Sequence, residues 1–204
     1  MKAYTYILTH DSGFAPNPFW GFCTLATCKP KMRSSASMDD WVVGVGSVNT
    51  VGAGKLVYAM QVCEVLSFDE YDRDPRFQSK KPKVSGSRQE RCGDNIYHRG
   101  SDGRWHQRPN PHHGRGHLKR DVQQGRHVLV AKTFYYFGAD ALEIPRRFKE
   151  LIPVTQGHRS RFGAELIQRF LSWLSQSAKP GVYGEPFAWV AGDKGTGACC
   201  PLRH

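Results

Sequence analysis

The pattern of apolar and polar positions predicts a β-rich core between residues 40 and 77. Residues 41–45 (WVVGV) form a β-branched and aromatic run, which is typical of a strand. Residues 56–65 form a longer run that is apolar at nearly every position, and such a run is usually buried on both faces of a sheet. The Gly-rich segment 49–54 supplies turn residues between them. We expect the rest of the chain to surround these two strands.

Further elements are predicted on either side of this core. Residues 3–9 alternate as a strand does, and the aromatic run 126–138 predicts another strand. Pro145 opens a short helix, because proline fits the first helical turn. Residues 162–174 repeat apolar side chains on one face of an amphipathic helix, with Ser160 as its expected N-cap.

A long segment after the first strand has no regular period. Residues 10–37 are rich in Gly and Pro, and they place Phe14, Phe19, Trp20 and Phe22 within nine residues. Long irregular loops in a compact domain tend to be functional. Such aromatic side chains either cover the core or offer stacking surfaces for a nucleobase.

The second irregular segment, about 78–125, is predicted to be a basic, loop-rich insertion in a single domain that spans residues 1–191. Between residues 76 and 120, twelve Lys and Arg stand against three acids, which accounts for most of the net charge of +11. Such a field attracts polyanions, and nucleic acid is the commonest in the cytosol. The alternative is a solvated loop that only aids solubility. Residues 192–204 are expected to form a flexible C-terminal tail.

Several classes of protein and site are not indicated. No run approaches 18 consecutive apolar residues and the N-terminus lacks a signal-peptide pattern, so we expect a cytoplasmic protein that does not contact membranes. The cysteines match no usual zinc spacing and are expected to be free thiols. The histidines of 106–117 and the acids of 69–74 predict no metal site either. Without a Walker A loop, dinucleotide fingerprint or zinc-deaminase signature, no cofactor is predicted.

The expected N-terminus of the amphipathic helix carries a candidate anion site. His158, Arg159 and Ser160 stand there, beside free N–H groups and the positive end of the helix dipole. The alternative is a helix cap with surface arginines.

Six segments together resemble one known family. They are DSGFAPNPFWGFCTLATCKPKMR, DDWVVGVGS, KLVYAMQV, SFDEYDRDPRFQSKKP, FYYFG and QGHRS. On these segments the chain resembles the nucleotide-modification-associated domain family, second type, over most of its length. The resemblance implies a link to phage and bacterial systems that make or handle modified DNA bases, and it implies no defined reaction.

More distantly, the chain is similar to the PUA-like superfamily, which includes the EVE, YTH and ASCH domains. DDWVVGVGS stands where those domains carry a Gly-Asp strand, although this chain has Asp39–Asp40 there, and Ser47 falls at the pocket end. The similarity implies an α+β fold, namely a mixed β-barrel flanked by helices, with a pocket that holds one flipped base.

The leading hypothesis is therefore a nucleic-acid-binding module that recognises a modified nucleotide, in DNA more than in RNA. A flipped base needs aromatic walls and hydrogen bonds to its edge. The candidates for base binding are Asn17, Phe19, Trp20, Thr27, Trp41, Ser47 and Tyr58. The candidates for phosphate contacts, which position nucleic acid without reading it, are Lys29, Lys31, Arg33, Arg76, Lys80, Lys81, Arg104, His158, Arg159 and Ser160.

The alternative hypothesis is an enzyme. ASCH-like proteins include amidohydrolases that act on acylated cytosine with a Lys, a Thr and a downstream Glu. The similarity implies Thr27, Lys29 and Glu64 for those roles, although the spacing around the lysine departs from the ASCH motif. A reactive lysine needs desolvation or cationic neighbours to lower its pKa, and Lys31 and Arg33 are close in sequence.

Overall fold

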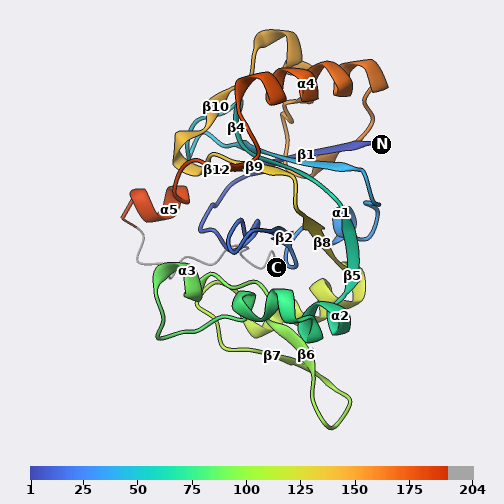
Figure 1. Cartoon of the computed structure of the whole chain (residues 1–204), viewed down its shortest axis with the longest axis vertical. Coiled ribbons are helices and arrows are strands. Elements are labelled where there is room, and N and C mark those ends of the chain that lie inside the picture. The colour runs from blue at the N-terminus through green and yellow to red at the C-terminus, as the bar shows by residue number, and fades with distance from the viewer. Residues whose placement is uncertain (193–204) are drawn as a thin grey trace.

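The structure, a computed structural model, describes residues 1–192, and its centre is a mixed seven-stranded sheet (Figure 1). Its strands are β1 (Ala3–Leu8), β3 (Trp41–Gly46), β4 (Lys55–Gln61), β9 (Phe134–Tyr136), β10 (Leu142–Glu143), β11 (His158–Arg159) and β12 (Gly181–Val182). They lie in the order β11-β1-β3-β4-β9-β12, with β10 beside β4. β1 and β3 run parallel, and β4 is antiparallel to both β3 and β9. The strands predicted at 3–9 and 41–45 are thus confirmed.

A second, three-stranded sheet packs against the first, and two stretches of the chain run from one sheet into the other. It contains β2 (Cys23–Leu25), β8 (His127–Ala131) and β5 (Glu64–Ser67) in that order. At the corner between the sheets, the Gln61 N–H donates to the Thr133 carbonyl at 3.0 Å and the Cys63 N–H donates to the Val130 carbonyl at 2.9 Å. The runs predicted as single strands, 56–65 and 126–138, each divide here between two sheets, because strands that turn a corner change sheets at a bend.

The α+β class is confirmed, but the described strands do not close into a barrel. The larger sheet ends at β11 on one side and at β12 on the other. The smaller sheet has β2 and β5 as its edges. The predicted barrel is therefore not confirmed by the described part of the chain.

Helix α4 (Ala164–Ser177) covers one face of the larger sheet (Figure 1). Its Ile167, Phe170 and Leu174 are buried against that face, and each contributes on the order of 1.5–3 kcal/mol of hydrophobic stabilisation. The other α-helices are α1 (Pro30–Arg33), α2 (Phe68–Arg73), α3 (Arg88–Arg91) and α5 (Phe187–Val190). Short 3₁₀ helices lie at Pro75–Lys80, Arg115–His117, Gly138–Asp140 and Arg146–Leu151, and a π-helix lies at Arg120–Gln124. Within residues 1–192, no helix is long and apolar enough to cross a membrane.

The basic insertion lies at the end of the molecule opposite α4, together with α2 (Figure 1). It contains a hairpin of β6 (Tyr97–Arg99) and β7 (Trp105–Gln107), as well as α3. Ile96 and Tyr97 are almost fully buried in the main core. The predicted tail 192–204 lies outside the described residues, apart from Gly192.

A row of tyrosines crosses the inner face of the larger sheet. The strand registers align Tyr6, Gly44, Tyr58 and Tyr136. The Tyr6 and Tyr58 hydroxyls are 2.8 Å apart. The Tyr58 ring lies directly over Gly44, where an added Cβ would collide with it. Only glycine at position 44 leaves room for the Tyr58 side chain to cross β3 and contact Tyr6. The row of tyrosines extends from the β11 edge of the sheet to the β12 edge.

Candidate functional site

An open groove with aromatic walls lies at the edge of the larger sheet, beside β9, β12 and α5. Its volume is about 640 Å³, inside the range of roughly 300–1,000 Å³ that is usual for ligand sites. The Phe19 and Trp189 rings stack, with centroids 5.6 Å apart and planes 16° apart, and Trp20 meets Phe19 edge-on. The lining includes Phe19, Trp20, Gln89, Lys132, Phe134, Val182, Glu185 and Trp189. Aromatic rings with a few polar groups suit a planar heterocycle.

Two buried side chains fix the loop that presents Phe19 and Trp20. The Asn17 amide donates to the carbonyls of Gly13 and Cys92, at 3.1 and 2.7 Å. The Lys80 ammonium donates to the Asn17 amide oxygen at 2.7 Å and to the Phe22 carbonyl at 2.9 Å. Burial lowers the pKa of Lys80 to about 8. Both side chains are fully buried, so Asn17 and Lys80 hold the loop from within instead of contacting a base or a phosphate as predicted.

The opposite wall is fixed by the residues that follow β1. The Trp189 indole N–H donates to the Ser12 carbonyl at 3.0 Å. The Asp11 carboxylate accepts from the Tyr136 hydroxyl at 2.7 Å and from the Phe187 N–H at 3.3 Å. Burial raises the pKa of Asp11 above its usual value. Asp11 thus joins α5 to the tyrosine row.

Four other predicted base-binding residues lie away from the groove. Trp41 packs on Tyr135 in the core beneath α4. Tyr58 contacts Tyr6, Ser47 shares a turn with Thr50, and Thr27 is fully buried. The predicted cluster of rings is wrong for Trp41, because alternate residues of a strand point to opposite faces of a sheet.

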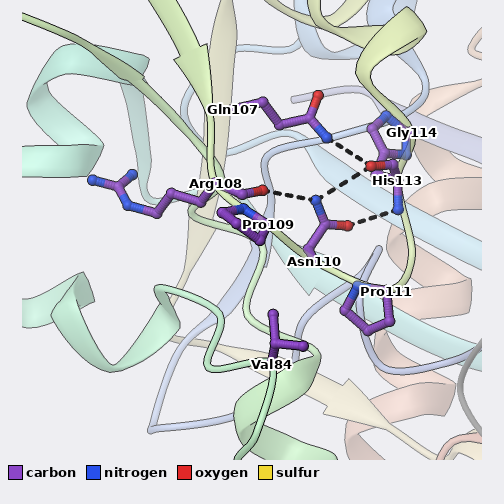
Figure 2. Close-up of a pocket in the computed structure, with 8 residues that line it drawn as sticks. All are labelled: Val84, Gln107, Arg108, Pro109, Asn110, Pro111, His113 and Gly114. Atoms are coloured by element: carbon purple, nitrogen blue, oxygen red, sulfur yellow. Dashed lines mark hydrogen bonds between the residues drawn. The ribbon is translucent and has the colours of Figure 1, made fainter.

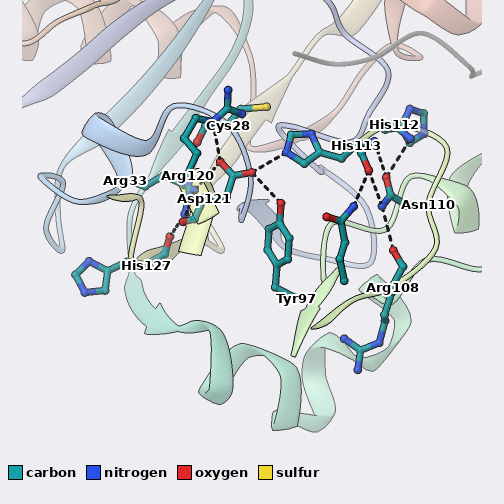
Figure 3. A network of polar contacts seen from close by, with 11 residues as sticks. Cys28, Arg33, Tyr97, Arg108, Asn110, His112, His113, Arg120, Asp121 and His127 are labelled. Carbon is teal, nitrogen blue, oxygen red and sulfur yellow. Dashed lines mark hydrogen bonds and ion pairs between the residues drawn. The ribbon is translucent and has the colours of Figure 1, made fainter. Parts of the chain in front are cut away.

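Arg33 was predicted to contact phosphate, but it is fully buried. Figure 3 shows its polar contacts. Its guanidinium donates to the carboxylate of Asp121 at 3.3 Å and to the carbonyls of Cys28 and His127. Asp121 also contacts the His113 ring nitrogen at 2.7 Å and accepts from the Tyr97 hydroxyl at 3.1 Å. Burial alone would raise the pKa of Asp121, but the His113 hydrogen bond and the charge of Arg33 lower it overall. Arg33 therefore anchors α1 to the insertion.

Acidic side chains also neutralise two other predicted phosphate ligands. Arg76 forms ion pairs with Glu64 at 2.7 Å and with Asp74 at 2.6 Å. Lys81 pairs with Asp72 at 3.0 Å. Arg104 is exposed. Glu64 belongs to β5, whereas Asp72 and Asp74 belong to the acidic turn after it, and this turn supplies countercharge to the insertion.

Three predicted phosphate ligands from distant segments meet at the other edge of the sheet. The Lys29 ammonium lies 4.4 Å from the Tyr6 ring centroid, at the start of α1. β11 pairs with β1 so that His158 stands opposite Tyr6. Partial burial and the charges of Lys29 and Lys31 lower the pKa of His158. Lys29, Lys31 and His158 are called the edge cluster below.

The neighbouring residues do not form the predicted helix-terminal site. Arg159 belongs to β11, its guanidinium donates to the Glu150 carbonyl at 3.0 Å, and Ser160 follows it in a connecting segment. Helix α4 begins at Ala164 with Gly163 as its N-cap, so Ser160 does not cap it. The prediction was wrong because residues 158 and 159 extend the sheet.

The residues implied for an amidohydrolase are placed in different environments. Glu64 faces Arg76, whose hydrogen bonds lower the pKa of the carboxylate. Thr27 is buried, and Lys29 lies on the Tyr6 ring. These contacts give no support to a shared catalytic centre.

A smaller pocket of about 400 Å³ lies in the insertion (Figure 2). The Asn110 amide organises its loop, because it donates to the Arg108 carbonyl and accepts from the His113 N–H. The Arg108 side chain extends away from this loop (Figure 2) and pairs with Asp72 at 2.8 Å. The residues that line this pocket include no Phe, Tyr or Trp, so it suits a planar ligand less than the aromatic groove does.

The histidines of the insertion are mostly internal. His112, His113 and His117 are each less than 5% exposed. His106 is exposed and contacts Asp102 at 3.0 Å. Within residues 1–192, no group of His, Cys, Asp or Glu side chains has a geometry that could hold a metal ion.

Among the residues that line the groove, only Phe19 and Trp20 were predicted as site residues from the sequence. Gln89, Lys132, Phe134 and Trp189 line it but were not predicted. The apolar run FAWV after Pro186 was the available signal for Trp189, yet nothing in the chain order places it beside Phe19.

The comparisons with known proteins assign a family. Searches of curated proteins and of solved structures found no match. A family model, nucleotide modification associated domain 2, matches residues 1–193. This match covers nearly the whole chain and agrees with the family that the six sequence segments resemble. The chain belongs to the nucleotide modification associated domain 2 family.

Proposed function

We propose that this domain binds a modified nucleotide, in DNA more than in RNA, with the base held in the aromatic groove. The observation that carries the proposal is the stacked pair of Phe19 and Trp189 beside Trp20 in an open groove. Stacking of one base on aromatic side chains contributes on the order of 1–3 kcal/mol. That energy offsets the few kcal/mol needed to unstack a base from a duplex. The association of the family with nucleotide modification supports this proposal, and we propose a phage or bacterial setting for it.

The polar groups of the groove supply the means to read a base edge. The Glu185 carboxylate accepts hydrogen bonds from amino groups, the Lys132 ammonium donates to carbonyl oxygens, and the Gln89 amide does both. A modification that adds a donor or acceptor to a base edge changes its fit to these groups. Such contacts discriminate because a polar group that the bound base covers without matching it carries a desolvation penalty.

We also propose that the fold is a distant, open relative of PUA-like domains. The parallel pairing of β1 with β3 supports this, as does the way the chain passes from one sheet to the other between β4 and β5 and between β8 and β9. The aromatic loop that follows β1 supplies the groove walls in this proposal.

The test begins with capture of DNA fragments by the protein, followed by mass spectrometry of their nucleosides. Enrichment of one modified nucleoside over the input supports the proposal and names the ligand. Equal capture of unmodified DNA, lost at moderate salt, contradicts it. The enriched oligonucleotide is then titrated against Trp20→Ala, for which we expect a loss of affinity of about 5- to 150-fold from the lost stacking.

The matched control is Trp105→Ala, which removes an indole of the β6–β7 hairpin outside the groove. It should leave the preference for the modified oligonucleotide intact. Thermal unfolding of both variants separates loss of binding from loss of fold. If Trp20→Ala and Trp105→Ala have equal effects on that preference, the groove does not hold the base.

A further inference from the structure

The aromatic groove has one charge of each sign, and the two charges start from opposite ends of a strand pair. Among the described residues that line it, Glu185 is the one acid and Lys132 is the one base. β12 runs parallel to β9, with Val182 opposite Tyr136. Lys132 precedes β9 and Glu185 follows β12, so the length of β9 separates their backbones. The two ends of the groove therefore differ in charge.

Close backbone packing fixes Glu185 beside the turn that follows β9. The Ala139 N–H donates to the Glu185 carbonyl at 2.8 Å. An added Cβ on Gly138 would collide with that carbonyl, and an added Cβ on Gly184 would collide with the Phe137 carbonyl. Gly138 also has a positive φ of 55°, which glycine adopts without strain. Residues without side chains on both sides of this contact hold Glu185 at the groove.

The Glu185 carboxylate is available to a ligand. The residue is exposed, and none of the Lys, Arg or His side chains of residues 1–192 forms an ion pair with it. Asp72 and Asp74, by contrast, both pair with cations near the insertion. The exposed Asp140 carboxylate lies beside Gly184 and adds negative charge at this end of the groove. In a chain of net charge +11, this end of the groove is suited to a cationic group.

The rings of the groove also favour a cation. Phe19 and Trp189 stack, and Trp20 stands edge-on to Phe19. The faces of aromatic rings attract ammonium groups, and several rings together bind organic cations. Trp20 has a φ of 57°, which is an outlier for a bulky side chain, and such strain clusters at functional sites. A carboxylate beside aromatic faces is an environment that binds an organic ammonium group.

We propose that the modification read by the groove is an amino group on an extension of the base, protonated and bound by the Glu185 carboxylate. This inference rests on the proposed function and deepens it, because it names the chemical class of the modified nucleotide. The exocyclic amines of adenine and cytosine are uncharged and occur in all DNA, so a contact with them alone would not mark a modified base. An added ammonium group gains a charge-assisted hydrogen bond to the carboxylate and the attraction of the ring faces. Lys132 repels it from the other end of the groove.

The test compares two probes that differ in the charge of the extension. One is deoxyuridine monophosphate with an aminoallyl group on its base, and the other is the same compound with its amine acetylated. The affinity of each is measured by calorimetry. Because hydrogen bonds to charged groups are stronger than those between neutral groups, we expect the wild type to bind the amine about tenfold more tightly. Equal affinities for the two probes would overturn the inference.

Glu185→Gln tests the assignment to this residue, because glutamine keeps the size of the side chain and removes its charge. It should reduce the ratio of the two affinities to about twofold or less. The matched control is Glu165→Gln, which removes an exposed carboxylate on α4, outside the groove. This control should keep the wild-type ratio. A ratio that is unchanged in Glu185→Gln, or that falls equally in both variants, would overturn the role of Glu185.

Trp20→Ala separates this inference from the proposed function. It should weaken the binding of both probes, because the base stacks on the ring in either case. If it does so while the wild type binds the two probes equally, the groove holds a base and the inference is wrong. If the amine preference depends on Glu185 but Trp20→Ala binds both probes as the wild type does, the amino contact stands and the groove does not hold the base. If neither probe binds the wild type, the inference is overturned, and capture of a modified nucleoside without an amine would leave the proposed function standing.

Discussion

The insertion and the edge cluster are both basic in sequence, but they differ in how many of their cations form ion pairs with carboxylates. The insertion and its flanks hold twelve Lys and Arg between residues 76 and 120. At least six of these cations lie in ion pairs, namely Arg76, Lys81, Lys83, Arg99, Arg108 and Arg120. The edge cluster has only two lysines and a histidine. Lys31 of that cluster is exposed, and no carboxylate of residues 1–192 forms an ion pair with it.

The acidic turn after β5 explains this difference. Its Asp69, Asp72 and Asp74 pair with Arg99, Lys81 and Arg76 respectively. These acids lie outside the window in which the insertion's charge was counted, but they fold back against it. Net charge along a sequence therefore overstates the field of a segment when its counterions come from the preceding element.

The largest effect is expected where the insertion's charges are buried. Asp121→Asn removes the only carboxylate that pairs with Arg33 among the described residues and leaves a fully buried guanidinium without countercharge. Breaking one partner of a buried pair costs about 3–5 kcal/mol. Urea unfolding should show this loss, whereas Asp102→Asn, at an exposed pair with His106, should change little. Equal midpoints for the two variants would mean that the network contributes no stability.

The same aspartate predicts an acid dependence of stability. The pKa of Asp121 is lower in the folded state than its unfolded value of about 3.9. As the pH falls, the unfolded chain therefore binds the proton first, so the stabilisation is complete above about pH 5 and is lost as the pH falls towards the folded pKa. The free energy of unfolding of wild type and Asp121→Asn, measured between pH 6 and 3, should converge. Parallel curves would contradict the assignment.

The next prediction concerns Tyr6 and Tyr58, the tyrosines that lie beneath the edge cluster. Gly44→Ala places a methyl group against the Tyr58 ring, and Tyr58 in turn holds Tyr6 beneath Lys29. Overpacking of this kind costs typically 1–3 kcal/mol. Gly114→Ala is the control, because an added Cβ there meets no atom. A Gly44→Ala protein as stable as that control would show that Tyr58 has another position available.

The two regions also show which parts of the fold and of the site could be predicted from the sequence alone. Local patterns predicted β1, β3 and the apolar face of α4 correctly, because alternation and helical periodicity are properties of contiguous residues. Phe19 and Trp20 were found by their clustering in a loop. Trp189 was missed and Trp41 misplaced, because ring partners depend on which face and which edge of the sheet each element reaches. Arg33 and Lys31 differ by two positions, and only the packing of Asp121 makes one structural and leaves the other at the surface.

The smallest effect is expected for the paired surface cations. Arg76→Gln removes a guanidinium that already holds Glu64 and Asp74, so little positive field is available for DNA to lose. Exposed pairs of this type contribute about 0–1 kcal/mol to stability, so the unfolding midpoint should hardly move. Lys31→Gln removes the same formal charge from an exposed lysine that no described carboxylate pairs with. At low salt we expect Arg76→Gln to keep the duplex affinity within about twofold of wild type and Lys31→Gln to weaken it more, since each phosphate contact contributes to the salt-dependent part of binding. The reverse order would place the nucleic acid on the insertion and remove the distinction between the two regions.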